Sequence, residues 1–257
     1  MTDIRSQAPA LVTGEFRVGR VLSRSFEILV QDFVKFFLVA LIVVAPYGLL
    51  AFAGGMRTSF TGPAPNFSAA GIGLGLAAVF GAVFLYPLSQ AVTLYGAFQD
   101  MRGRPFNMGE AFARAFARFS PLLGLAIAWG FAVILGMILL IVPGLMLLAS
   151  FYVSLPACVV EGLGPLQSMS RSAALTKGHR WKVFGIYVLI VIVSSIIGSV
   201  IRLAFAGMTG LIGAIFAGLI WNALFAAYHS VVVAVMYHDL RVLKEGIDIE
   251  RIAAVFD

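Results

Sequence analysis

The sequence predicts an all-α, polytopic membrane protein, and three of its features lead to that prediction. Of its 257 residues, 61% are hydrophobic and only 12% are charged, whereas a typical soluble domain is about 45–50% apolar and about 25% charged. The apolar residues gather in long runs, and most Lys and Arg residues lie between alternate runs. So little polar surface excludes a water-soluble enzyme, and the single cysteine, Cys158, excludes an intrachain disulfide.

Residues 1–257 are expected to form a single integral membrane domain with six transmembrane helices. A spanning helix needs about 20 mostly apolar residues. Residues 119–160 carry no charge and are long enough for two crossings, and Pro143-Gly144 near their middle is a turn signal. The predicted spans, which pair as three hairpins, are 33–54, 69–98, 121–142, 145–160, 183–203 and 208–237.

A short amphipathic helix is predicted before each hairpin, at residues 15–31, 107–119 and 165–178, and is expected to lie in the membrane interface. The first two have complete apolar stripes, and the third has only part of one. The first stripe consists of Val18, Val21, Leu22, Ser25, Phe26 and Leu29, and the second of Met108, Ala111, Phe112, Ala115, Phe116 and Phe119. Asn107 and Glu110 have the spacing of a capping box.

Each of these short helices carries an arginine between two small residues, namely Arg24, Arg114 and Arg171. The recurrence of this pattern before alternate spans indicates three tandem units, each consisting of a short helix followed by two spans.

The distribution of basic residues predicts the orientation. All of the 18 Lys and Arg residues except Arg57 and Arg202 lie in the N-terminal segment, the loops after the second and fourth spans, or the tail at 239–257. By the positive-inside rule, both termini and these loops face the cytoplasm, across the inner membrane of a bacterium. The formal net charge of +6 is therefore attributed to attraction to anionic lipid headgroups, and no nucleic-acid partner is expected.

Six basic residues on this face are predicted to contact lipid headgroups or a protein partner: Arg24, Arg114, Arg171, Arg180, Lys182 and Arg241. A sharper version of this hypothesis gathers Glu161, Arg171, Asp239 and Arg241 into one polar cluster. The alternative is that the charged segments simply anchor the helix ends at the interface.

Polar residues inside the predicted spans leave two interpretations open. No Asp or Glu lies within a span, which argues against proton coupling, although sodium coupling remains open. Small and polar residues form stripes, for example Gly71, Gly75 and Ala78, and such stripes are typical of close helix packing. The alternative is a polar cavity around Gln90, Asn222 and His229.

The sequence contains no motif for catalysis, for a metal or for a cofactor. Nucleophile-elbow, phosphate-loop, zinc-protease and dinucleotide patterns are absent, and Cys158 and the three histidines lack metal-ligand spacing. A non-enzymatic protein without a cofactor or metal is therefore predicted.

Two stretches carry a family resemblance. Residues 159–189 (VVEGLGPLQSMSRSAALTKGHRWKVFGIYVL) and 235–253 (VMYHDLRVLKEGIDIERIA) resemble the membrane-domain family named after glycerophosphoryl diester phosphodiesterases. The resemblance implies a bacterial six-span inner-membrane protein, and relatives are expected to have tyrosine where His238 stands. The phosphodiesterase activity resides in a separate barrel domain that this chain lacks, so the resemblance implies no such activity.

These observations together favour an accessory or scaffold component of a larger membrane protein complex that also contacts anionic lipid. The alternative is a transporter or lipid-handling protein with a polar cavity between its hairpins.

Overall fold

The computed structural model describes residues 16–53, 69–102 and 107–245, and these residues are helical apart from short connections, with no strand among them. The all-α prediction is confirmed. The helices are α1 (Val18–Gln31), α2 (Phe33–Ala53), α3 (Ala69–Met101), α4 (Met108–Ala117), α5 (Phe119–Leu139), α6 (Ile141–Ser150), α7 (Ser154–Val160), α8 (Pro165–Thr176) and α9 (Arg180–Glu245).

Six segments of the described chain are long and apolar enough to cross a membrane, as predicted. They are Phe33–Leu50, Ala69–Met101, Phe119–Leu139, Ile141–Val160, Arg180–Gly207 and Ile215–Glu245. Helix α3 extends beyond the predicted end of its span at 98. Helix α9 begins before the predicted start at 183 and continues through 239–245 of the predicted tail. Residues 15, 54 and 246–257 of the predicted elements lie outside the described residues.

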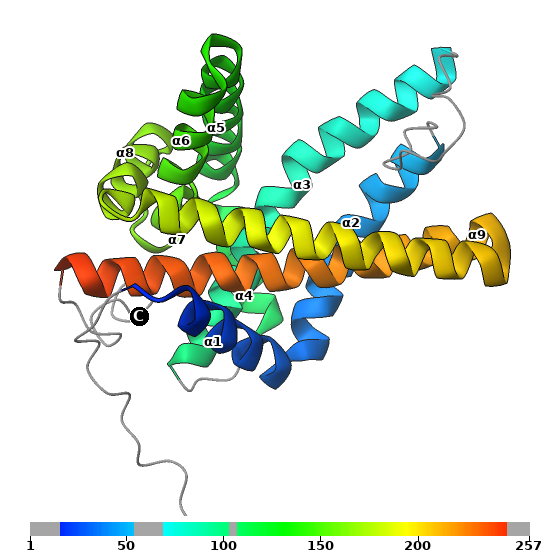
Figure 1. The fold of residues 1–257 in the computed structure, drawn as a ribbon, viewed down its shortest axis with the longest axis horizontal. Coiled ribbons are helices and arrows are strands. Elements are labelled where there is room, and N and C mark those ends of the chain that lie inside the picture. The colour runs from blue at the N-terminus through cyan, green and yellow to red at the C-terminus, as the bar shows by residue number, and fades with distance from the viewer. Residues whose placement is uncertain (1–15, 54–68, 103–106, 246–257) are drawn as a thin grey trace, which may run out of the picture.

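The last two of these segments belong to α9, which folds back on itself (Figure 1). The indole Nε1 of Trp221 donates to the backbone oxygen of Ser194 at 3.1 Å, which holds the two halves side by side. A Cβ at residue 198 would lie 2.5 Å from that indole, so glycine is needed there for the two halves to approach.

The structure corrects the predicted turn at Pro143-Gly144. The chain reverses at Leu140, whose backbone is extended (φ −161°, ψ 139°), and α6 already begins at Ile141. Pro143 is tolerated in the first turn of α6 because its missing N–H would have no intrahelical acceptor there. Gly144 lies against α5, where a Cβ would approach the backbone nitrogen of Met137 to 2.7 Å. The Pro-Gly pair therefore starts and packs a helix rather than forming the turn.

The predicted span 145–160 is also interrupted, since α6 ends at Ser150 and α7 begins at Ser154. Side chains of α8 bond to the backbone groups that this break frees. The hydroxyl of Ser172 donates to the Ser150 oxygen at 2.7 Å and accepts from the Val153 N–H at 3.2 Å, and Thr176 Oγ1 donates to the same Ser150 oxygen. A non-helical break in so apolar a segment is stable because its polar backbone is satisfied within the protein.

The short helices pack their small and apolar faces against the protein. Asn107 caps α4 as predicted, its side chain accepting from the Glu110 N–H at 3.3 Å. In α1, Val21, Ser25 and Leu29 of the predicted stripe are buried, but Phe26 is 61% exposed and Ile28 takes its place. Phe116 of α4 is likewise exposed. The stripe therefore describes contacts with other helices, and the two phenylalanines lie outside those contacts.

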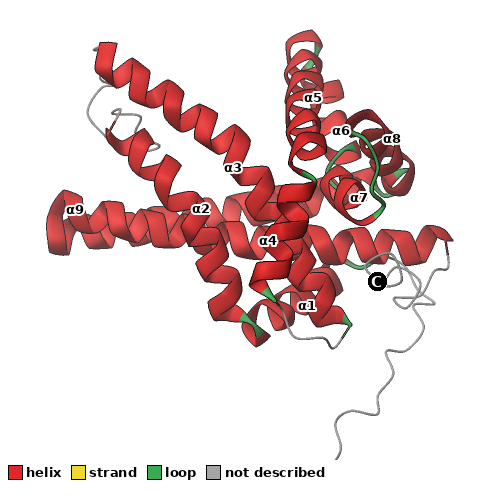
Figure 2. Cartoon of the chain, turned by 180° about the vertical axis from the view of Figure 1, so that it is seen from behind, coloured by secondary structure: helices red, strands yellow, loops and turns green. Residues whose placement is uncertain are grey.

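The long helices diverge from a common centre (Figures 1 and 2). Residues 87–99 of α3 and 230–240 of α9 are buried on every side, and α1, α4, α7 and α8 surround them. We call this region the base. The arms are the outer parts of the helix pairs, at 45–53 with 69–86, at 126–150 and at 191–222, and those of their apolar side chains that the structure describes are largely exposed.

The order of contacts in the base is cyclic. The short helix α4 packs on the preceding α3, α8 packs on the preceding α7, and α1 packs on the end of α9. The tandem units inferred from the sequence stay a prediction.

Candidate functional site

Five side chains form a charged network where α7, α8 and α9 meet. Arg171 of α8 donates from Nε to both carboxylate oxygens of Glu161, at 2.8 and 2.9 Å, and also pairs with Glu245. Tyr237 donates its hydroxyl hydrogen to Glu161 Oε1 at 2.6 Å. Arg241 donates to Glu245 Oε2 at 3.0 Å and to the Tyr237 oxygen at 3.3 Å. We call these residues the Glu161 network.

The network is electrically balanced and largely screened from solvent. Two guanidinium groups face two carboxylates, and the side chains of Glu161 and Arg241 are only 15% and 13% exposed. Burial alone would lower the pKa of Arg171, but its hydrogen bonds and charge contacts with Glu161 and Glu245 outweigh this, so its pKa is raised. The network therefore joins three helices through permanent charges whose partners lie within the protein.

Asp239 does not belong to this network, contrary to the predicted four-residue cluster. It is 1% exposed and faces α1, with Arg20 at 3.9 Å and Arg24 at 4.0 Å. Successive residues of a helix are rotated by about 100°, so residue 239 lies on the opposite face of α9 from residues 237 and 241. The other three members, Glu161, Arg171 and Arg241, are brought together as expected.

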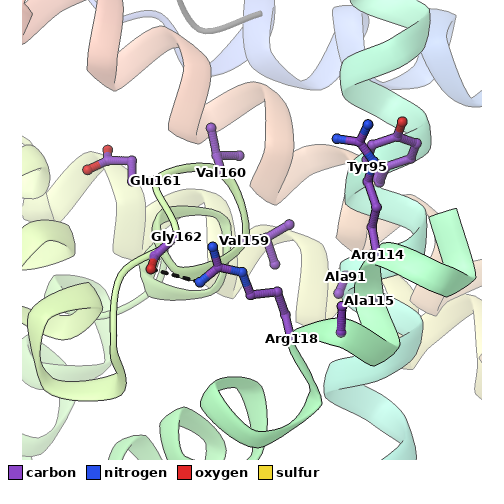
Figure 3. A pocket seen from close by; sticks show the side chains of 10 residues that line it. Ala91, Tyr95, Arg114, Ala115, Arg118, Val159, Val160, Glu161 and Gly162 are labelled. Atoms are coloured by element: carbon purple, nitrogen blue, oxygen red, sulfur yellow. Dashed lines mark hydrogen bonds between the residues drawn. The ribbon is translucent and has the colours of Figure 1, made fainter. Parts of the chain in front are cut away.

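A pocket of about 350 Å³ opens beside the network, between α3, α4 and the end of α7 (Figure 3). Its lining includes Ala91, Tyr95, Arg114, Arg118, Glu161 and Gly162. The guanidinium of Arg114 lies over the Tyr95 ring, 5.2 Å from its centre, and is also bonded to Glu110 at 2.9 Å. Arg118 donates from Nη1 to the backbone oxygen of Gly162 at 2.8 Å.

Gly162 is required where Arg118 reaches α7. Its φ of +68° is in the left-handed region that favours glycine. A Cβ at this position would also lie 2.5 Å from Arg118 Nη2. The sequence thus places a residue without a side chain where the arginine reaches the backbone.

The remaining predicted contact residues lie apart from this pocket. Lys182, near the start of α9, donates to the backbone oxygen of Phe16 at 3.3 Å, and Arg180 lies two residues before it. Arg24 faces Asp239, whereas Arg171 and Arg241 belong to the Glu161 network. Of the six predicted contact residues, Arg114 alone lines the pocket.

The three predicted cavity residues do not line this pocket either. Gln90 is buried in α3, and its amide nitrogen has no hydrogen-bond partner among the described residues. Asn222 is exposed and donates to the Gly218 oxygen of its own helix at 2.8 Å. His229 Nε2 lies 2.8 Å from the Tyr152 hydroxyl, which links α9 to the turn between α6 and α7. A cavity among the three stays a prediction.

The i, i+4 spacing of Arg241 and Glu245 predicts their pairing, and the structure has this pair at 3.0 Å. Three other residues of the site, Tyr95, Arg118 and Tyr237, were not predicted from the sequence. A repeated motif in the sequence could have pointed to Tyr237. Residues 98–102 (Phe-Gln-Asp-Met-Arg), near the end of α3, and 237–241 (Tyr-His-Asp-Leu-Arg), near the end of α9, share an aromatic, polar, Asp, apolar, Arg pattern. The rings of Phe98 and Tyr237 meet edge to face in the base, with centroids 6.1 Å apart. In the described part of the chain, no group of three or more His, Cys, Asp and Glu side chains could hold a metal ion.

Comparisons with known proteins provide no identity for this arrangement. No protein-family model matches the chain, and neither a curated protein nor a solved structure is significantly similar to it. The resemblance to the membrane-domain family thus rests on the sequence, most specifically on residues 159–189 and 235–253, and stays a prediction.

Proposed function

We propose that this protein is a non-enzymatic accessory or scaffold component of a bacterial inner-membrane assembly. Its base would lie on the cytoplasmic side, in contact with anionic lipid, and its three arms would cross the bilayer as hairpins. The observation that carries the proposal is the contrast between a closely packed base and arms whose apolar flanks are exposed.

The exposed flanks support association within the membrane. At the outer end of the α5–α6 arm, Ile138 and Leu139 are 74% and 77% exposed. In hydrocarbon, helices associate through van der Waals packing of such flanks with lipid chains or with helices of another protein. The base holds the arms in place through contacts that do not involve these flanks.

The position of charge supports the proposed orientation. Among the described residues, basic side chains lie in or beside the base, except Arg202 in the α9 arm. A base that carries nearly all of the positive charge would face the cytoplasm, because cytoplasmic segments of membrane proteins are enriched in Lys and Arg. The family resemblance also favours a bacterial six-span inner-membrane protein.

The proposal is tested by native mass spectrometry of protein that is extracted gently from its own membrane. We expect a protein partner at a fixed stoichiometry. A photo-crosslinking amino acid at Ile138 should capture the same partner, and the same substitution at Leu122, which is 1% exposed, serves as the control. Retention of lipid alone, with no protein adduct at Ile138, would overturn the proposal and favour the lipid-handling alternative.

A further inference from the structure

The pocket between α3, α4 and α7 presents positive charge. Its ionic lining residues are Arg114, Arg118 and Glu161. The carboxylate of Glu161 is bonded to Arg171 and to Tyr237, and Figure 3 shows its side chain directed away from Arg118. The charge of Glu161 is thus balanced by its own network, and the charge of Arg114 is paired with Glu110. Arg118 therefore determines the sign of the pocket.

Backbone hydrogen bonds fix the position of Arg118 beside the pocket. Its backbone N–H donates to the Ala115 oxygen at 3.2 Å and its backbone oxygen accepts from the Leu122 N–H at 3.0 Å, so the turn between α4 and α5 fixes its position. Its guanidinium bonds to the Gly162 oxygen, which is a neutral acceptor. Within the described chain, Arg118 takes part in no ion pair, so most of its five N–H donors remain to bind a ligand.

Arg114 lies on α4 and Arg118 directly follows the end of this helix, and both side chains line the pocket. Guanidinium groups match the oxygens of a phosphate through paired hydrogen bonds. A volume of about 350 Å³ exceeds that of a phosphate group and leaves room for the organic part of a ligand.

We propose that this pocket is a binding site for a phosphate group, with Arg118 as its principal ligand-binding residue and Arg114 as the second. The inference rests on the proposed function, which it deepens by assigning anionic contact to one pocket instead of to the whole basic face. The phosphate would come from the headgroup of an anionic phospholipid or from a soluble phosphate compound.

The first test compares variants in nanodiscs that contain phosphatidylglycerol and phosphatidylcholine. Native mass spectrometry should show one phosphatidylglycerol retained by the wild-type protein, and Arg118→Gln should weaken this retention about tenfold, as expected for loss of charge-assisted hydrogen bonds. Lys177→Gln is the matched control, because it removes one charge from an exposed position on the base outside the pocket. Equal losses in the two variants would show bulk attraction and overturn the proposal.

Arg118→Lys distinguishes a loss of binding from a loss of fold. It retains the charge without the planar guanidinium, so it should keep the melting temperature of the wild type and bind with an affinity between those of the wild type and Arg118→Gln. Retention by both variants at the wild-type level would overturn the proposal.

Inorganic phosphate alone identifies the source of the ligand. If it raises the melting temperature of the wild type but not of Arg118→Gln, and phosphatidylglycerol is not retained, the site takes a soluble phosphate. Retention of phosphatidylglycerol without such a shift assigns a lipid headgroup. If neither ligand binds the wild type, the assignment of the pocket as a phosphate site is overturned. The crosslinking experiment at Ile138 then tests the proposed function separately.

Discussion

The base and the arms differ in how their helices are packed and in how their polar groups are hydrogen-bonded. In the base, residues of α3 and α9 are enclosed on every side by other helices, and polar groups bond between elements, as Tyr237 does with Glu161. In the arms, polar side chains bond within one helix or to the adjacent half, as Asn222 and Trp221 do. The difference shows that the positions of the helices relative to one another are set in the base.

The largest expected effect comes from breaking the Glu161 network. Arg171→Met would remove the bidentate partner of Glu161 and one of the two arginines that pair with Glu245. We expect a loss of about 2–3 kcal/mol in the free energy of unfolding, below the usual cost of breaking a fully buried pair because Arg171 is 26% exposed. Unfolding in detergent, followed by circular dichroism, measures this loss.

The matched control lies in an arm. Arg202 donates to Ser199 of its own helix at 3.3 Å, so Arg202→Met should change the free energy of unfolding by less than about 0.5 kcal/mol. If Arg202→Met cost as much as Arg171→Met, the assignment of tertiary stability to the base would be wrong.

A smaller effect is expected from an apolar truncation in the base. Leu94 of α3 is fully buried, and Leu94→Ala should cost about 2 kcal/mol, the low end of the usual range, because association in lipid depends on packing rather than on removal from water. Leu139→Ala, at the exposed end of α5, should cost little. The same unfolding measurement compares the two, and equal losses would contradict the distinction between base and arm.

The sequence predicted the helical fold because its signals are local. Long apolar runs, the Asn107 cap and the spacing of small residues such as Gly71 and Gly75 each depend on neighbouring residues, and the structure has all three features. The burial of this small-residue stripe agrees with the packing interpretation. Pro143-Gly144 was misread because the same pair suits a turn or the first turn of a helix, and contact with Met137 decides between them.

The candidate site could be predicted only in part, because its contacts join distant residues. Arg118 and Gly162 are 44 positions apart, and Glu161 and Tyr237 are 76 apart. One sequence does not reveal which of its many arginines and carboxylates will meet across such distances. The periodicity of α9 could have excluded Asp239 from the cluster, since it separates residue 239 from residues 237 and 241 by about half a turn.

A glycine substitution would test the packing of one arm. Gly144→Ala adds a Cβ 2.7 Å from the backbone of Met137 and should cost about 1 kcal/mol, the low end for overpacking, because the arm can shift. Gly130→Ala on α5 meets no atom within 4 Å and should be neutral or slightly stabilising. Thermal melting of both variants provides the comparison, and a destabilised Gly130→Ala would show that helix contacts in this arm differ from those described.

The smallest expected effect is a dependence of stability on pH that arises from His179, at the edge of the base. His179 contacts the ring of Phe16, and burial together with the charges of Lys244 and Lys182 lowers its pKa below the ordinary value of 6.5. In the acidic range the unfolded chain therefore binds this proton more readily than the folded chain does. The contribution of His179 to stability is present above its unfolded pKa and is lost as the pH falls through its folded pKa.

His179→Gln removes this titration and leaves the carboxylates of the protein in place. Melting temperatures of the wild type and the variant, measured from about pH 7.5 to about pH 5.5, should diverge, with the wild type losing more on acidification. Because the carboxylates contribute equally to both proteins, the difference in slope isolates the imidazole. Parallel slopes would show that the N-terminal edge of the base accommodates a protonated His179 beside the two lysines without cost.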